Sequence, residues 1–155
     1  MRIFLIEDFD LKAERIRAYI RKQEPDSKVE LFHSYQSGLR AIEQSPPDLI
    51  ILDMTIPTFD PGIDSRHGRP RSLGGYELMR KMKRRGIARP VFIISQLEAY
   101  GEGESKVTFG EVKERCASEF SQIFKGAVFY SQNSDSWQVG LKKVLLEVKV
   151  EGQRN

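Results

Sequence analysis

The stretch that decides the fold is DLIILD, residues 48–53, in which an unbroken apolar run ends in an aspartate. A strand that is apolar on both faces is typical of a parallel sheet covered by helices on either side. A second such run, PVFIIS at 90–95, ends in a serine, and a third, RIFLI at 2–6, is followed at once by Glu7 and Asp8. Polar side chains therefore follow three apolar strands, at the point where each strand ends.

Helical patterns alternate with these strands along the chain. Two more strands are predicted at 28–32 and 126–131, and the last helix shows an apolar stripe at helical spacing. Five β-α units in succession predict an α/β fold, a three-layer doubly wound parallel sheet of five strands. The first helix is expected to begin after Asp10, and the next three are expected at 35–44, 76–85 and 108–124. The last helix carries the apolar stripe Trp137, Leu141, Val144, Leu145 and Val148.

The chain of 155 residues fits a single domain over residues 1–150, followed by a frayed tail at 151–155. We interpret two segments without predicted helix or strand as inserted loops, at about 58–73 and 97–108. Segments of that length tend to be functional or disordered. We expect them to cover the site or to bind a partner.

The composition favours a soluble cytoplasmic protein. Hydrophobic residues make up 39% and charged residues 30%, and no apolar run is long enough to span a membrane. Cys116 is the single cysteine, so the chain cannot form an internal disulfide. A net charge of +3 is too small to predict a nucleic-acid partner, and we interpret the arginines at 66–71 as solvated surface.

The carboxyl ends of parallel strands meet at one edge of the sheet, where such folds bind their ligands. If the three strands are neighbours, Glu7, Asp8, Asp53 and Ser95 converge there. Three carboxylates repel one another unless a cation balances them. An all-oxygen site of this kind suits Mg²⁺.

Five short motifs in chain order resemble the receiver domain of response regulators, the flavodoxin-like module of two-component signalling. The match spans nearly the whole chain. The motifs are the acidic pair in FLIED, LIILDMTIP with Asp53 and Pro57, Gly75 in GGYELMRKM, Ser95 in PVFIIS, and Gly126-Ala127.

The resemblance implies a role for each site residue. Asp53 would accept a phosphoryl group, and Mg²⁺ would be held by Asp8, Asp53 and the backbone carbonyl of Thr55, with Glu7 acting through water. Ser95 would act as the switch hydroxyl and bind a phosphoryl oxygen. An aromatic side chain, that of Tyr130 or Phe129, would repack in response.

The resemblance also implies the partners. A histidine kinase or phosphotransfer protein would donate the phosphoryl group, and a stand-alone receiver would signal to an output protein in trans. A homodimer through the fourth helix, fifth strand and fifth helix is a further expectation. We expect no enzyme activity beyond self-phosphorylation and self-dephosphorylation at Asp53, and neither a membrane nor a nucleic-acid partner.

The sequence departs from the receiver pattern at the end of the fifth strand, where the family keeps a lysine. Here no lysine lies between Lys125 and Lys142, and Gln132 or Asn133 falls at that place. Either amide could donate a hydrogen bond but brings no charge. Lys106, or an arginine of the inserted loops, could substitute in space. The alternative is a pseudo-receiver that binds partners without being phosphorylated.

Two other protein families with a similar pattern of strands and helices fit this sequence less well. A phosphatase of the haloacid-dehalogenase type needs an aspartate two residues after its nucleophile, and that position is Thr55. A flavodoxin needs a phosphate cradle after the first strand, where this chain has the acidic EDFD.

Overall fold

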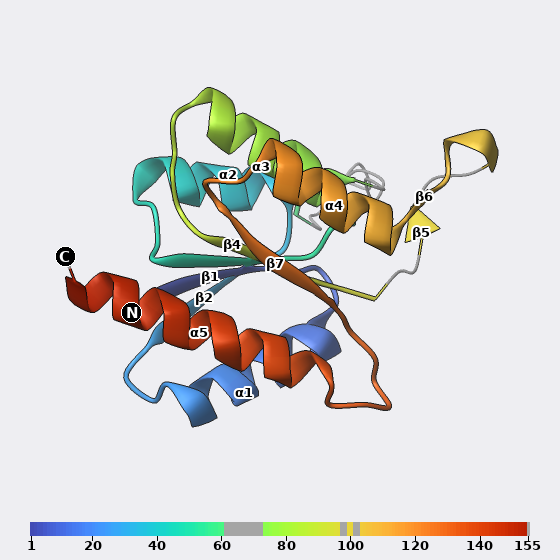
Figure 1. The fold of residues 1–155 in the computed structure, drawn as a ribbon. Helices are drawn as coiled ribbons and strands as arrows, with labels where there is room; N and C mark the ends of the chain where they lie inside the picture. Colours follow the sequence, from blue (N-terminus) through green and yellow to red (C-terminus); the bar gives the residue numbers. More distant parts are fainter. Residues whose placement is uncertain (61–72, 97–98, 101–102, 155) are drawn as a thin grey trace.

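The computed structural model describes residues 1–60, 73–96, 99–100 and 103–154. Five parallel strands form one sheet in the order β2-β1-β3-β4-β7 (Figure 1). The sheet confirms the predicted α/β class. Its strands are β1 Arg2–Ile6, β2 Lys28–Phe32, β3 Leu49–Leu52, β4 Val91–Ser95 and β7 Phe124–Phe129.

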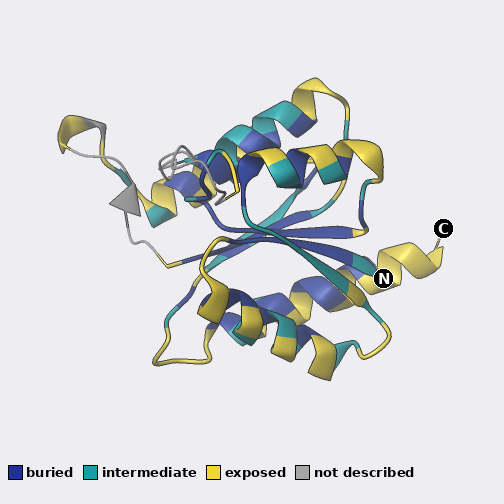
Figure 2. Ribbon diagram, turned by 180° about the vertical axis from the view of Figure 1, so that it is seen from behind, coloured by how far each residue is buried: buried dark blue, intermediate teal, exposed yellow. Residues whose placement is uncertain are grey.

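The helices cover both faces of the sheet, as the double winding requires. α1 (Asp10–Gln23) and α5 (Trp137–Arg154) lie on one face, and α2 (Tyr35–Gln44), α3 (Gly74–Arg84) and α4 (Phe109–Glu119) lie on the other (Figure 1). Figure 2 shows the central strands as buried and the outer faces of the helices as exposed. β3 and β4 are buried along their whole length, because both faces are covered.

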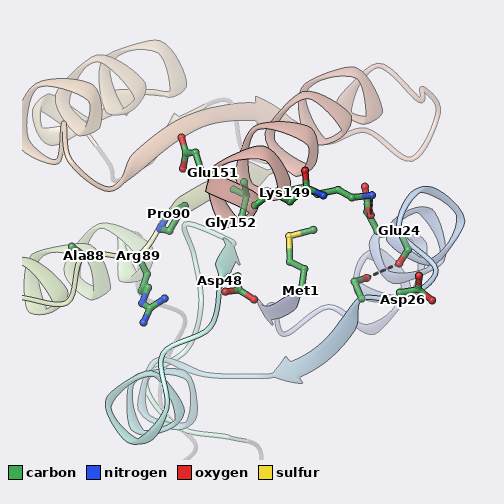
Figure 3. A pocket seen from close by; sticks show the side chains of 13 residues that line it. Met1, Glu24, Asp26, Asp48, Ala88, Arg89, Pro90, Lys149, Glu151 and Gly152 are labelled. Carbon is green, nitrogen blue, oxygen red and sulfur yellow. Dashed lines mark hydrogen bonds and ion pairs between the residues drawn. The ribbon is translucent and has the colours of Figure 1, made fainter. Parts of the chain in front are cut away.

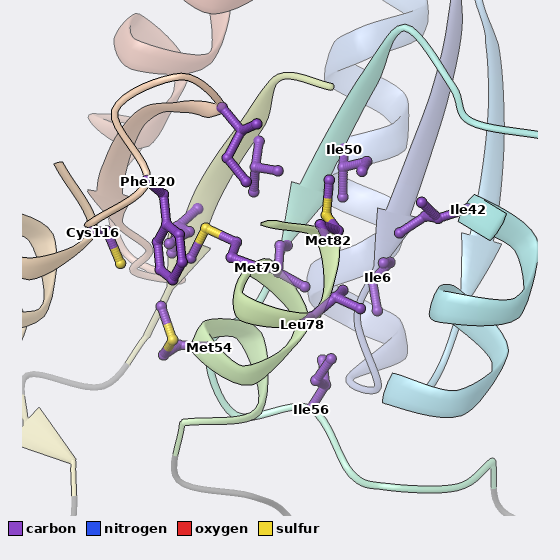
Figure 4. Close-up of a cluster of buried hydrophobic side chains, with 14 of the residues drawn as sticks. Ile6, Ile42, Ile50, Met54, Ile56, Leu78, Met79, Met82, Cys116 and Phe120 are labelled. Atoms are coloured by element: carbon purple, nitrogen blue, oxygen red, sulfur yellow. The ribbon is translucent and has the colours of Figure 1, made fainter. Parts of the chain in front are cut away.

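Each face of the sheet has its own hydrophobic core. Figure 4 shows the core under α2, α3 and α4, where Met54, Met79 and Phe120 gather beside strand residues such as Ile50. The core under α1 and α5 has a different membership: Ile3, Leu5, Ile16, Ile20, Ile51, Phe92, Tyr130, Trp137, Leu141 and Val144 belong to it. Full burial of a large apolar side chain stabilises a fold by about 1.5–3 kcal/mol, so both cores contribute strongly.

Three elements differ from the prediction. β7 begins at Phe124, two residues earlier than predicted, because Phe124 pairs with Val91 across a register shift that precedes the pair of Gly126, with a φ of 133°, and Phe92. α4 ends at Glu119 rather than at 124. α5 continues to Arg154, through residues predicted to fray, and Glu151 there pairs with Lys125 at 3.4 Å.

A short hairpin-like pair, not predicted, occupies part of the second inserted segment. β5 (Ala99–Tyr100) and β6 (Val107–Thr108) are antiparallel, with the 3₁₀ turn η1 (Gly103–Ser105) between them. The first inserted segment, predicted at 58–73, lies largely outside the described residues. Among the described helices, none is both long and apolar enough to cross a membrane.

Candidate functional site

The site forms at the carboxyl edge of the sheet, beside the point where the strand order reverses. β1 pairs with β2 on one side and with β3 on the other, and β3 pairs with β4. Glu7 and Asp8 follow β1, Asp53 follows β3, and Ser95 ends β4. Parallel strands in register thus bring the predicted residues to one edge, the place where open α/β sheets bind ligands.

Glu7, Asp8 and Asp53 form an acidic cluster in which one carboxylate oxygen of each lies within 4.8 Å of the others. Glu7 is 2% exposed and Asp53 4%, whereas Asp8 faces solvent. Burial, followed by the charge of Asp53, raises the pKa of Glu7 to about 7, and the same two causes raise the pKa of Asp8. The cluster therefore carries more negative charge than its surroundings balance.

Lys12, which no sequence motif predicts as a site residue, lies in the middle of this cluster. Its side chain is 1% exposed, and Nζ lies 2.5 Å from Glu7 Oε1 and 3.0 Å from Asp53 Oδ1. Nζ also donates to the backbone carbonyl of Ile94 at 2.7 Å. Burial alone would lower the pKa of Lys12, but the carboxylates of Asp53 and Glu7 raise it above its ordinary value. Lys12 is therefore a buried ammonium with three acceptors.

The amides expected at this place lie elsewhere. Gln132 and Asn133 are exposed, and within the described residues neither side chain has a hydrogen-bond partner. The backbone carbonyl of Gln132 instead accepts a hydrogen bond from Arg15. Lys106 is likewise exposed. The cation at Asp53 comes from the first helix and not from the end of β7.

The second oxygen of Asp53 is held by the loop that follows it. Oδ2 accepts hydrogen bonds from the Thr55 hydroxyl at 2.8 Å and from the Thr55 backbone N–H at 3.3 Å. Gly75, at the start of α3, donates its N–H to the Met54 carbonyl. A Cβ at Gly75 would lie 2.9 Å from the Asp53 carbonyl oxygen, so only glycine lets α3 approach the loop this closely.

The two predicted switch aromatics lie on opposite faces of the sheet. Phe129 pairs in register with Ser95 and contacts Phe109 of α4 edge-to-face at 6.4 Å. Tyr130 is 1% exposed and belongs to the core under α1 and α5. Its backbone N–H donates to the Ser95 carbonyl at 2.7 Å. Both aromatics therefore lie close to the end of β4.

Tyr130 also contacts the helix that carries Lys12. The ammonium of Lys12 lies 5.6 Å from the centre of the Tyr130 ring, and Arg15 donates to the Tyr130 hydroxyl at 2.9 Å. The Arg15 guanidinium lies over both Tyr130 and Trp137, whose ring centres are 5.6 Å apart. These contacts join the acidic cluster to the α1–α5 face.

A separate cavity of about 580 Å³ lies at the amino ends of the strands, away from the acidic cluster (Figure 3). Its lining mixes polar and apolar residues, and some of the polar ones are already paired: Lys149 of α5 reaches Glu24 at 3.1 Å, and Asp48 accepts a hydrogen bond from the Arg2 backbone N–H. We therefore do not interpret it as the site of the chemistry.

Known proteins match the chain in sequence and in fold. It is 29% identical over 150 residues to Detocs response regulatory protein DtcB of Enterobacter cloacae, covering 96% of this chain and 100% of that protein. A signal receiver domain from Vibrio parahaemolyticus superposes with a TM-score of 0.64 at 19% identity, covering 99% of this chain and 96% of the other. The chain has the fold of a response-regulator receiver domain. No family model matches the sequence.

A second solved structure with this fold was determined in a metal-bound form. The Mn²⁺-bound form of response regulator Rcp1 matches with a TM-score of 0.59 at 13% identity, over 92% of this chain and 90% of that one. In the present chain the donors are all oxygen, which suits Mg²⁺. Three carboxylates and one ammonium leave two negative charges, which a divalent cation would balance. The residues present therefore fit a magnesium ion.

Proposed function

We propose that this protein is a receiver that accepts a phosphoryl group on Asp53 in the presence of Mg²⁺ and signals to a separate partner protein. The observation that carries the proposal is the charge arrangement around Asp53. One oxygen of this buried carboxylate contacts the ammonium of Lys12, the other is held by Thr55, and two further carboxylates lie within 4.8 Å.

Asp53 would act as the nucleophile. A carboxylate oxygen attacks the phosphorus of a phosphohistidine or a small acyl phosphate, a new P–O bond forms, and the bond to the donor atom breaks with its electron pair leaving on the donor. Asp8, Asp53 and the Thr55 carbonyl would hold Mg²⁺, with Glu7 acting through water. When bound, Mg²⁺ supplies charge that stabilises the transferring phosphoryl oxygens. Ser95 would donate its hydroxyl to one of those oxygens.

The alternative of a pseudo-receiver depended on the absence of a lysine after the fifth strand. The ammonium that Lys12 places 3.0 Å from Asp53 Oδ1 removes that reason. We therefore favour a working receiver. Its donor would be a histidine kinase or phosphotransfer protein, its output would act in trans, and its only chemistry would be at its own Asp53.

The direct test is the intact mass of the protein after incubation with Mg²⁺ and acetyl phosphate. We expect one phosphoryl adduct on the wild type and on Asp26→Asn, a matched control at an exposed turn, and none on Asp53→Asn or after chelation of Mg²⁺. An adduct that persists in Asp53→Asn would show that another residue is the acceptor. A wild type that binds Mg²⁺ but gains no adduct from either acetyl phosphate or a phosphohistidine donor would contradict the proposal.

A further inference from the structure

Lys12 lies within the acidic cluster although it belongs to α1, a helix in which no motif predicts a site residue. We propose that Lys12 binds the phosphoryl group on Asp53, and that its rearrangement reaches Tyr130 and Trp137 on the α1–α5 face. The proposal rests on the proposed function of Asp53. It assigns to a helix a role that the receiver pattern gives to the end of a strand.

Three oxygen acceptors surround Nζ of Lys12. The three ammonium hydrogens are matched by Glu7 Oε1 at 2.5 Å, Asp53 Oδ1 at 3.0 Å and the Ile94 carbonyl oxygen at 2.7 Å. A phosphoryl group on Asp53 would bring further charged oxygens to the same position. A negatively charged oxygen adds a Coulomb attraction that the neutral carbonyl of Ile94 lacks, and this attraction is strong where water screens little, so the ammonium will favour a phosphoryl oxygen over that carbonyl.

The burial of Lys12 strengthens its attraction to Asp53. Lys12 is 1% exposed, so water screens its attraction to Asp53 very little. On α1, Lys12 precedes the buried Ile16 and Ile20 at intervals of four residues, which turns its side chain toward the sheet together with theirs. The packing of the helix thus directs the side chain of Lys12 toward the acidic cluster.

Two sets of contacts connect Lys12 to the aromatic side chains of Tyr130 and Trp137. Ile94, whose carbonyl Lys12 would release, directly precedes Ser95, and the Ser95 carbonyl accepts the Tyr130 N–H. Arg15, one turn after Lys12 on α1, donates to the Tyr130 hydroxyl and lies over Trp137. A change at Lys12 therefore reaches Tyr130 both through β4 and through α1.

The contacts that link Lys12 to Tyr130 and Trp137 lead to one face of the sheet. Tyr130 and Trp137, the first residue of α5, belong to the core between the sheet and the helices α1 and α5, whereas Phe129 contacts Phe109 on the α4 side. We expect the α1–α5 face to respond when Asp53 is modified.

The test uses beryllofluoride, which mimics a phosphoryl group on an aspartate, with Mg²⁺ and the fluorescence of Trp137, the single tryptophan. We expect a saturable change in the wild type and in Lys22→Met, a control at an exposed lysine of α1. In Lys12→Met the concentration for half-saturation should rise at least about tenfold, as expected when a buried charged hydrogen bond is lost. Lys12→Gln, which keeps a neutral donor, should fall in between.

The outcomes separate the two proposals. If Lys12→Met and Lys12→Gln respond like the wild type, and acetyl phosphate modifies all three equally, the role of Lys12 is wrong while Asp53 remains the acceptor. If the wild type itself gains neither beryllofluoride nor an adduct, both proposals fail. If the Lys12 variants do not fold, the ¹⁵N signal of the Lys12 ammonium in the wild type decides: it should shift when beryllofluoride is added, and an unchanged signal refutes the contact.

Discussion

Replacing Lys12 with methionine should destabilise the protein in a way that depends on pH and on Mg²⁺. The variant keeps the apolar stem of the side chain but leaves Glu7 and Asp53, which are 2% and 4% exposed, without their ammonium. It also leaves the Ile94 carbonyl without its donor. Breaking a buried charge pair costs about 3–5 kcal/mol, so we expect the free energy of unfolding in urea to fall by that amount at pH 8 without Mg²⁺.

The pH dependence follows from the carboxyl groups left behind. The pKa of Glu7, which burial and the charge of Asp53 already raise to about 7 in the wild type, will lie well above that of the unfolded chain once the ammonium is lost, so the folded variant binds this proton more tightly. The loss of stability should therefore be small near pH 4.5, the ordinary pKa of a glutamate, and grow as the pH rises toward 8. Mg²⁺ should stabilise Lys12→Met more than the wild type, because it supplies the missing positive charge.

A double-mutant cycle tests whether Lys12 and Glu7 stabilise each other. Glu7→Gln removes one of the two carboxylates that Lys12 contacts, so Lys12→Met combined with Glu7→Gln should lose less stability than the two single changes predict together. Lys22→Met, at an exposed position of the same helix, should change the free energy of unfolding by less than about 0.5 kcal/mol. Additive losses in the cycle, unaffected by pH and Mg²⁺, would refute a buried charge cluster around Lys12.

Two further predictions concern the metal and the loop after Asp53. Mg²⁺ should bind about tenfold more weakly at pH 6 than at pH 8, because a proton must leave Glu7, whose pKa is about 7; a dissociation constant from titration calorimetry that does not vary with pH would contradict this. Gly75→Ala should cost about 1–3 kcal/mol, because its Cβ would meet backbone atoms of Asp53 and Met54 at 2.9 and 3.0 Å. Gly152→Ala, in open space on α5, should be neutral or stabilising by up to about 1 kcal/mol, and equal urea midpoints for the two variants would rule out the close approach.

The sheet and the acidic cluster were predictable because both depend on local patterns. Apolar runs such as 48–53 define buried parallel strands, and the residue that follows each strand must lie at the carboxyl edge. The order of the strands then brings Glu7, Asp8 and Asp53 together. Ser95 lies at the end of β4 as predicted, and its role as a switch stays a prediction.

Lys12 was missed because a lysine in a helix rich in basic residues usually faces solvent. The signal was present in the spacing, since Lys12, Ile16 and Ile20 fall on one face, but only the position of α1 against the sheet gives that face a carboxylate partner. The early start of β7 was equally hidden. It depends on the pairing of Phe124 with Val91 across a register shift, and these two residues are far apart in the sequence.

The burial of Lys12 also determines how the protein should respond to ionic strength. Exposed pairs such as Arg15–Asp135, whose side chains are 31% and 71% exposed, weaken as dissolved ions gather around them. The contact of Lys12 with Glu7 lies beyond the reach of those ions, because both side chains are almost fully enclosed. The electrostatic balance at Asp53 is therefore set by the fold, and it should vary little between dilute and concentrated salt.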